Sequence, residues 1–123
     1  MLIVEDDAAV HDMLLRLLEV HGFRTVGATM VAQAQAIAAT EPIDAVILDL
    51  VLSHHENGVD FLEWLRQHAQ YSRTPVCVLT GLMTVPEEDE LRIRAAGAEV
   101  FHKPGALDAL VSYLRNVTAD RRG

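Results

Sequence analysis

At 123 residues, half of them hydrophobic, the chain is long enough for one domain with a core of its own and shows no sign of a second. Its net charge of −8 argues against a nucleic-acid-binding surface, because binding to phosphates depends on clustered Lys and Arg. We expect one domain over residues 1–118, followed over 119–123 by a polar tail or the start of a linker.

The sequence carries no sign of a membrane or secretory segment. No apolar stretch approaches the roughly 20 residues that span a bilayer, and the start of the chain lacks the basic region of a signal peptide. The single cysteine, Cys77, lies inside an apolar run, which excludes a disulfide framework and favours an inert, buried thiol. We therefore expect no membrane partner and a cytoplasmic location.

The first half of the chain alternates short apolar runs with segments of helical spacing. Leu2-Ile3-Val4 predicts a strand, and the apolar residues that follow at i, i+3, i+4 and i+7 predict a helix over 8–21, which Gly22 ends. Residues 23–27 predict a second strand, whose mixed polarity is typical of a sheet edge. A second helix is predicted over 30–40.

The second half repeats this alternation. Residues 44–49 form an almost continuous apolar run that ends at Asp49, which is typical of a strand covered on both faces. The later elements are predicted, in order, as a helix at 59–69, a strand at 76–79, a helix at 86–96, a strand at 100–102 and a helix from 107 onwards. Five strands alternating with five helices predict an α/β fold, a doubly wound parallel sheet with helices on both faces.

Reactive side chains lie where the predicted strands end. Glu5 and Asp6 follow the first strand, Asp49 ends the third, Thr80 follows the fourth and Lys103 follows the fifth. Ligands of such sheets bind beyond the carboxyl ends of the strands. Carboxylates that converge there repel one another unless a cation lies among them, and Mg²⁺ suits oxygen ligands. Because an aspartate can also attack a phosphoryl group, the pattern points to an aspartyl-phosphate site.

Four motifs at these strand ends resemble the receiver domain of bacterial two-component response regulators, and the resemblance covers nearly the whole chain. The motifs are Leu2 to Asp7, Asp44 to Leu50, Val78 to Gly81 and Lys103-Pro104. The resemblance implies a flavodoxin-like receiver fold, a five-stranded parallel sheet with strand order 2-1-3-4-5. It also implies a regulatory phosphoacceptor that assists its own phosphorylation and dephosphorylation, and not an enzyme.

The resemblance further implies a role for each acidic residue of the site. Asp49 matches the residue that accepts a phosphoryl group from a phosphohistidine on a sensor histidine kinase or a histidine phosphotransfer protein. Asp6, Asp49 and the main-chain carbonyl of Val51 match the direct ligands of Mg²⁺. Glu5 matches the other acid of the pair that follows the first strand, and this acid acts through a water molecule.

By the same resemblance, Thr80 hydrogen-bonds the phosphoryl group and Lys103 pairs with it. Their response to phosphorylation implies an output surface built from the helix at 86–96, the strand at 100–102 and the last helix, which is also a candidate homodimer contact. On the helix at 86–96 we expect Ile93 to be exposed and to contact a partner.

The sequence departs from the family pattern beside Lys103. Val100 occupies the position three residues before the lysine, where the family often has an aromatic residue. Phe101 is adjacent, but on a strand its side chain should point to the other face of the sheet. We therefore expect the aromatic switch coupled to Thr80 to be absent or rebuilt.

Other polar residues have simpler explanations. Asp7 is expected to cap the first helix, and the adjacent pair His54 and His55 to be solvated, since no further spaced metal ligand accompanies them.

Three other classes of protein are alternatives to a phosphorylated receiver. A phosphatase of the haloacid dehalogenase type requires a second acid where Val51 stands, and an FMN-binding protein requires hydroxyls and glycines where the acidic residues follow the first strand. The serious alternative is a receiver that serves as a docking or dimerisation module with weak or no phosphorylation.

Overall fold

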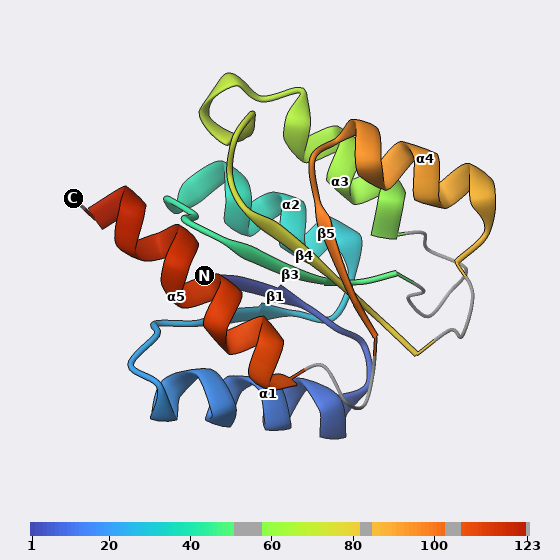
Figure 1. The fold of residues 1–123 in the computed structure, drawn as a ribbon. Helices are drawn as coiled ribbons and strands as arrows, with labels where there is room; N and C mark the ends of the chain where they lie inside the picture. The colour runs from blue at the N-terminus through green and yellow to red at the C-terminus, as the bar shows by residue number, and fades with distance from the viewer. Residues whose placement is uncertain (51–57, 82–84, 103–106, 123) are drawn as a thin grey trace.

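Five parallel strands form one sheet, which carries helices on both faces (Figure 1). The computed structural model describes residues 1–50, 58–81, 85–102 and 107–122. In chain order its elements are β1 (Leu2–Val4), α1 (Ala8–Val20), β2 (Val26–Ala28), α2 (Val31–Thr40), β3 (Val46–Asp49), α3 (Gly58–Arg66), the 3₁₀ turn η1 (Ala69–Tyr71), β4 (Val76–Thr80), α4 (Glu87–Ala95), β5 (Glu99–His102) and α5 (Leu107–Arg122). The strand order β2-β1-β3-β4-β5 confirms the predicted fold.

Two layers of helices explain why the central strand is apolar at consecutive positions. In β3, Val46 and Leu48 belong to a buried cluster with side chains of α2, α3 and α4, whereas Ile47 belongs to a second cluster with side chains of α1 and α5. Figure 1 shows α1 and α5 on one side of the sheet and α2, α3 and α4 on the other. The apolar residues of β3 are therefore buried on both faces of the sheet, as the sequence predicts.

The first helix ends at the predicted glycine, but the next strand begins later than predicted. Gly22 has a φ of 86°. The N–H of Gly22 donates to the carbonyl of Glu19, and the N–H of Phe23 donates to the carbonyl of Leu18 (2.9 Å). These two bonds form a Schellman motif, in which the residue after the glycine packs against the last turn of the helix. Phe23 accordingly lies in the same buried cluster as Leu18, so β2 begins only at Val26 and not at residue 23.

The orientation of α4 contradicts the expectation for Ile93. The side chain of Ile93 is only 1% exposed and packs in the core, whereas that of Leu91 is 60% exposed. Arg92 forms ion pairs from α4 to Asp60 (2.6 Å) and Glu63 of α3. The hydrogen bond from Arg92 lowers the pKa of Glu63. Because α4 packs on α3 through the face that carries Ile93, its exposed apolar residue is Leu91.

Two further helix boundaries differ from the sequence prediction. α3 ends at Arg66 and not near residue 69, because the chain then tightens into 3₁₀-type bonds from Gln67 to Trp64 and from His68 to Leu65. At the other end of the chain, α5 continues to Arg122, beyond position 118 where we expected the domain to end.

Candidate functional site

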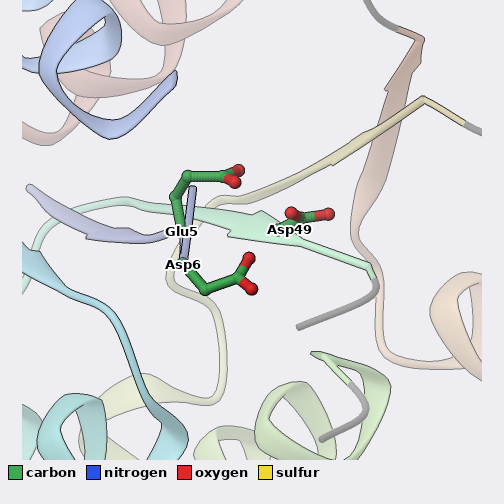
Figure 2. A group of neighbouring side chains, drawn as sticks. All are labelled: Glu5, Asp6 and Asp49. Carbon is green, nitrogen blue, oxygen red and sulfur yellow. The ribbon is translucent and has the colours of Figure 1, made fainter. Parts of the chain in front are cut away.

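Three carboxylates meet at the carboxyl ends of β1 and β3. The register pairs Val4 with Leu48, so Glu5 and Asp6, which follow β1, come beside Asp49 at the end of β3. One carboxylate oxygen from each residue lies within 4.8 Å of the others. Figure 2 shows the three side chains directed toward a common space. The structure thus brings together the acidic residues that the sequence predicted.

The environment of this acidic cluster favours a bound cation. Glu5 is only 2% exposed, and Asp6 and Asp49 are half-buried. Negative charges held this close and partly out of water repel one another, and a cation among them removes the repulsion. The donors are all carboxylate oxygens, which suit a hard ion such as Mg²⁺ better than Zn²⁺, because Zn²⁺ sites in proteins are usually rich in Cys and His.

Backbone hydrogen bonds hold the residues after β1 in place. The N–H of Glu5 donates to the carbonyl of Ala28 in β2 (3.0 Å), and Oε1 of Glu5 accepts from the N–H of Asp7 (3.2 Å). The main chain on both sides of Asp6 is therefore anchored. This anchoring holds Glu5 and the main chain of Asp6 at the end of β1, beside Asp49.

Asp7 is the N-cap of α1, as the sequence predicts. Its Oδ1 accepts hydrogen bonds from the N–H groups of Ala9 (2.9 Å) and Val10 (3.1 Å), which have no partner within the helix. Its side chain is exposed and lies outside the acidic cluster. Two adjacent aspartates thus have different environments, since Asp7 caps the helix and Asp6 joins the cluster.

Of the other predicted site residues, Thr80 lies among those that the structure describes. Thr80 ends β4, is 1% exposed and follows Leu79, which pairs with Asp49, so it lies at the same edge of the sheet as the carboxylates. Lys103 and Val51 lie outside the described residues, as do His54 and His55. Lys103 follows directly after the end of β5, the neighbour of β4.

The side chains of β5 confirm that Val100 and Phe101 face opposite sides of the sheet. Val100 packs in the cluster shared with α3 and α4, whereas Phe101 packs in the opposite cluster and lies against Tyr113 of α5, with the ring centroids 5.7 Å apart. Val100, which pairs with Val78 two residues before Thr80, thus places a small aliphatic residue on the same side of the sheet as Thr80. Phe101 is directed away from that side.

One described residue beside Asp49 was missed by sequence reasoning. Gly58, the first residue of α3, is buried against the main chain of Asp49. The sequence signal was a glycine at the end of a polar loop, which is ordinary turn chemistry, and only the tertiary contact shows what it does.

Comparison with known proteins identifies the chain. Residues 1–115 match the family described as "Response regulator receiver domain". The chain belongs to this receiver family. As a receiver domain it is a regulatory signalling domain of two-component systems, which is the expected class.

Curated relatives of the receiver domain include longer proteins. The KDP operon transcriptional regulatory protein KdpE of Escherichia coli is 36% identical over 115 residues, which are 93% of this chain and 48% of that protein. A putative NtrX-like response regulator of Rickettsia bellii is 31% identical over 93% of this chain and 23% of that protein. The receiver domain therefore spans half or less of these relatives.

Solved structures share the fold of the receiver domain. The chemotaxis protein CheY4 of Vibrio cholerae superimposes with a TM-score of 0.83 at 26% identity, over 94% of this chain and 95% of that one. The receiver domain of a signal transduction histidine kinase from Syntrophus aciditrophicus also gives a TM-score of 0.83, at 25% identity, over 97% of this chain and 89% of that one. Among the helices that the structure describes, none is both long and apolar enough to cross a membrane.

Proposed function

We propose that Asp49 accepts a phosphoryl group in a reaction that depends on Mg²⁺. The observation that carries the proposal is the convergence of carboxylate oxygens from Glu5, Asp6 and Asp49 within 4.8 Å at the carboxyl edge of the sheet. A parallel sheet presents its ligand sites at this edge. Membership of the receiver family supports the same assignment.

The donor set fits Mg²⁺, which typically takes one or two carboxylates together with water and phosphate oxygens. Asp6 and Asp49 would bind it directly, and Glu5, the more buried acid, would act through a water molecule. The main-chain carbonyl of Val51 is proposed as a further ligand, at a position outside the described residues. When bound, the ion neutralises the charge of the carboxylates and of the incoming phosphoryl group.

In the proposed reaction a carboxylate oxygen of Asp49 attacks the phosphorus of a phosphohistidine. A P–O bond forms while the P–N bond breaks, and the leaving imidazole nitrogen keeps the electron pair and takes up a proton. The hydroxyl of Thr80 and the ammonium of Lys103 would contact the phosphoryl oxygens. The chain assists its own phosphorylation and later dephosphorylation, and it acts as a regulatory domain and not as a turnover enzyme.

Binding of beryllofluoride, an analogue of a phosphoryl group, tests this proposal. The wild-type protein should bind it only in the presence of Mg²⁺, and Asp49→Asn should abolish the binding because an amide lacks the anionic carboxylate oxygen to which beryllium coordinates. The measurement is ¹⁹F NMR or calorimetric titration with and without Mg²⁺.

Asp44→Asn is the matched control, because Asp44 lies just before the other end of the same strand and is exposed. It should bind beryllofluoride as the wild type does. A wild-type protein that fails to bind, or an Asp49→Asn variant that still binds, would contradict the proposal and leave the docking or dimerisation module as the alternative.

The phosphoryl donor is proposed to be a sensor histidine kinase or a histidine phosphotransfer protein in the cytoplasm. Cys77 is buried and forms no disulfide, and burial raises the pKa of its thiol. A free thiol of this kind is typical of a reducing compartment. The net charge of −8 argues against direct nucleic-acid binding by this domain. Transfer of ³²P from a phosphorylated phosphotransfer domain to the wild type, and not to Asp49→Asn, checks the donor class.

The proposed output surface comprises α4, β5 and α5, and Leu91 is its exposed apolar residue on α4. We expect Leu91→Glu to weaken beryllofluoride-induced self-association by about tenfold, since a buried charge would replace an apolar contact. Sedimentation velocity measures the change. Val20→Glu, at the even more exposed end of α1, is the control and should leave self-association unchanged. Equal effects of the two variants would exclude this surface.

A further inference from the structure

Gly58 makes direct backbone contact with the residue that we propose as phosphoacceptor. It is the first residue of α3 and is buried. Its N–H donates to the carbonyl of Leu50 (3.0 Å). A Cβ at this position would lie 2.2 Å from the carbonyl oxygen of Asp49, and 3.2 Å from both the carbonyl carbon of Asp49 and the carbonyl oxygen of Leu50. The hydrogen of glycine is the only substituent that fits.

The obstructing atoms cannot rotate away, because they belong to the main chain of the sheet. The N–H of Leu50 donates to the carbonyl of Leu79, and Asp49 is paired with Leu79 in the register between β3 and β4. On the other side, Val59 and Phe61 bury the first turn of α3 in the core, each 1% exposed or less. The peptide of Asp49 is therefore enclosed between β4 and the start of α3.

We propose that Gly58 is a positioning residue for Asp49, an inference that rests on the proposed phosphoacceptor function. By letting α3 approach the main chain of Asp49 directly, Gly58 determines where β3 ends and hence where the Asp49 carboxylate lies relative to Glu5 and Asp6. The bond from Gly58 to Leu50 also joins the two described ends of the connection between β3 and α3. The length of that connection can then vary without moving Asp49.

The size of the clash sets the expected effect. Ordinary contacts of a Cβ begin near 3.4 Å, so an alanine that meets the Asp49 carbonyl at 2.2 Å must open the contact by 3.4 − 2.2 = 1.2 Å. A misplacement of about 1 Å at a reacting group lowers a rate by roughly 100-fold. The shift falls on the main chain of the phosphoacceptor, so Gly58→Ala should affect phosphorylation far more than a clash of the same size elsewhere.

The test compares Gly58→Ala with Gly27→Ala, in which the new Cβ would meet the imidazole of His11 at 2.2 Å and no atom of Asp49. Both variants, and the wild type, are measured for phosphorylation by acetyl phosphate, for Mg²⁺ affinity and for the free energy of unfolding. We expect Gly58→Ala to lower the phosphorylation rate at least about tenfold and to weaken Mg²⁺ binding, and Gly27→Ala to stay within about threefold of the wild type. Comparable losses of stability in the two variants would show that destabilisation alone is not the cause.

Each other outcome refutes a specific statement. A wild-type protein that is not phosphorylated refutes the proposed function and with it the role of Gly58. If the wild type is phosphorylated and Gly58→Ala remains within threefold of it, or if Gly27→Ala loses as much activity, only the positioning role fails.

A second measurement decides the matter if Gly58→Ala does not fold. Hydrogen exchange in the wild type should show the amide of Gly58, bonded to Leu50, protected by at least about 1,000-fold. Protection below roughly tenfold would mean that the contact opens freely and would overturn the proposal.

Discussion

Asp6→Asn is expected to weaken Mg²⁺ binding by the receiver domain by at least about 100-fold. Mutations of residues that only support a metal ligand already lower affinity by roughly 10- to 100-fold, so loss of Asp6, which we propose as a direct ligand, should do no less. The wild type should gain about 1.4 kcal/mol of stability when free Mg²⁺ exceeds the dissociation constant tenfold. Asp6→Asn should gain almost none at the same concentration. Isothermal titration and thermal unfolding with and without Mg²⁺ measure the two effects.

Asp7→Asn is a closely matched control, because the same substitution is made one residue further along the chain. Asn keeps a side-chain oxygen to accept the hydrogen bonds from Ala9 and Val10, so the helix cap should persist. Its Mg²⁺ affinity is expected to stay within about threefold of the wild type at physiological ionic strength, where exposed charges are screened. Equal losses in the two variants would mean that the ion is attracted by diffuse negative charge and is not coordinated by the acidic cluster.

Gly27→Ala should destabilise the domain by about 2 kcal/mol, which corresponds to roughly 8 °C in Tm for a chain of this size. Gly27 lies in β2, and the imidazole of His11 from α1 occupies the space in which a Cβ would be placed. The Nε2 atom of His11 is buried and makes no hydrogen bond to any described residue. The ring is therefore held by packing, and an added methyl group must displace it. Chemical denaturation of the purified variant measures the loss.

A double-mutant cycle identifies the source of that loss. Because His11→Ala removes the ring, the methyl group added by Gly27→Ala should fit in the double variant, which should then be more stable than additivity predicts by at least about 1 kcal/mol. Strictly additive effects would show that the alanine disturbs the strand and not the packing of α1. The same cycle should leave phosphorylation nearly unchanged, since neither residue belongs to the acidic cluster.

The sequence by itself determined the elements, the parallel sheet and the residues at its carboxyl edge. Runs of consecutive apolar residues mark strands buried on both faces, and parallel strands that all end at one edge bring Glu5, Asp6 and Asp49 together whatever the details of packing. The cap formed by Asp7 was predictable for a related reason, because an N-cap depends on hydrogen bonds within a single turn.

The tertiary structure alone decided which face of α4 is buried and which glycines lie in close contact with other elements. α4 contains two large apolar residues, Leu91 and Ile93, and periodicity cannot rank two opposite faces that carry one each; packing on α3 buries Ile93. Gly27 and Gly58 are constrained by atoms from other elements, so no local pattern distinguishes them from glycines in turns. Local sequence specifies hydrogen bonds and periodicity within an element, whereas close approach between elements depends on how they dock. For this receiver domain, the convergence of Asp49 with Glu5 and Asp6 was therefore predictable from the sequence, and the contact proposed to position Asp49 was not.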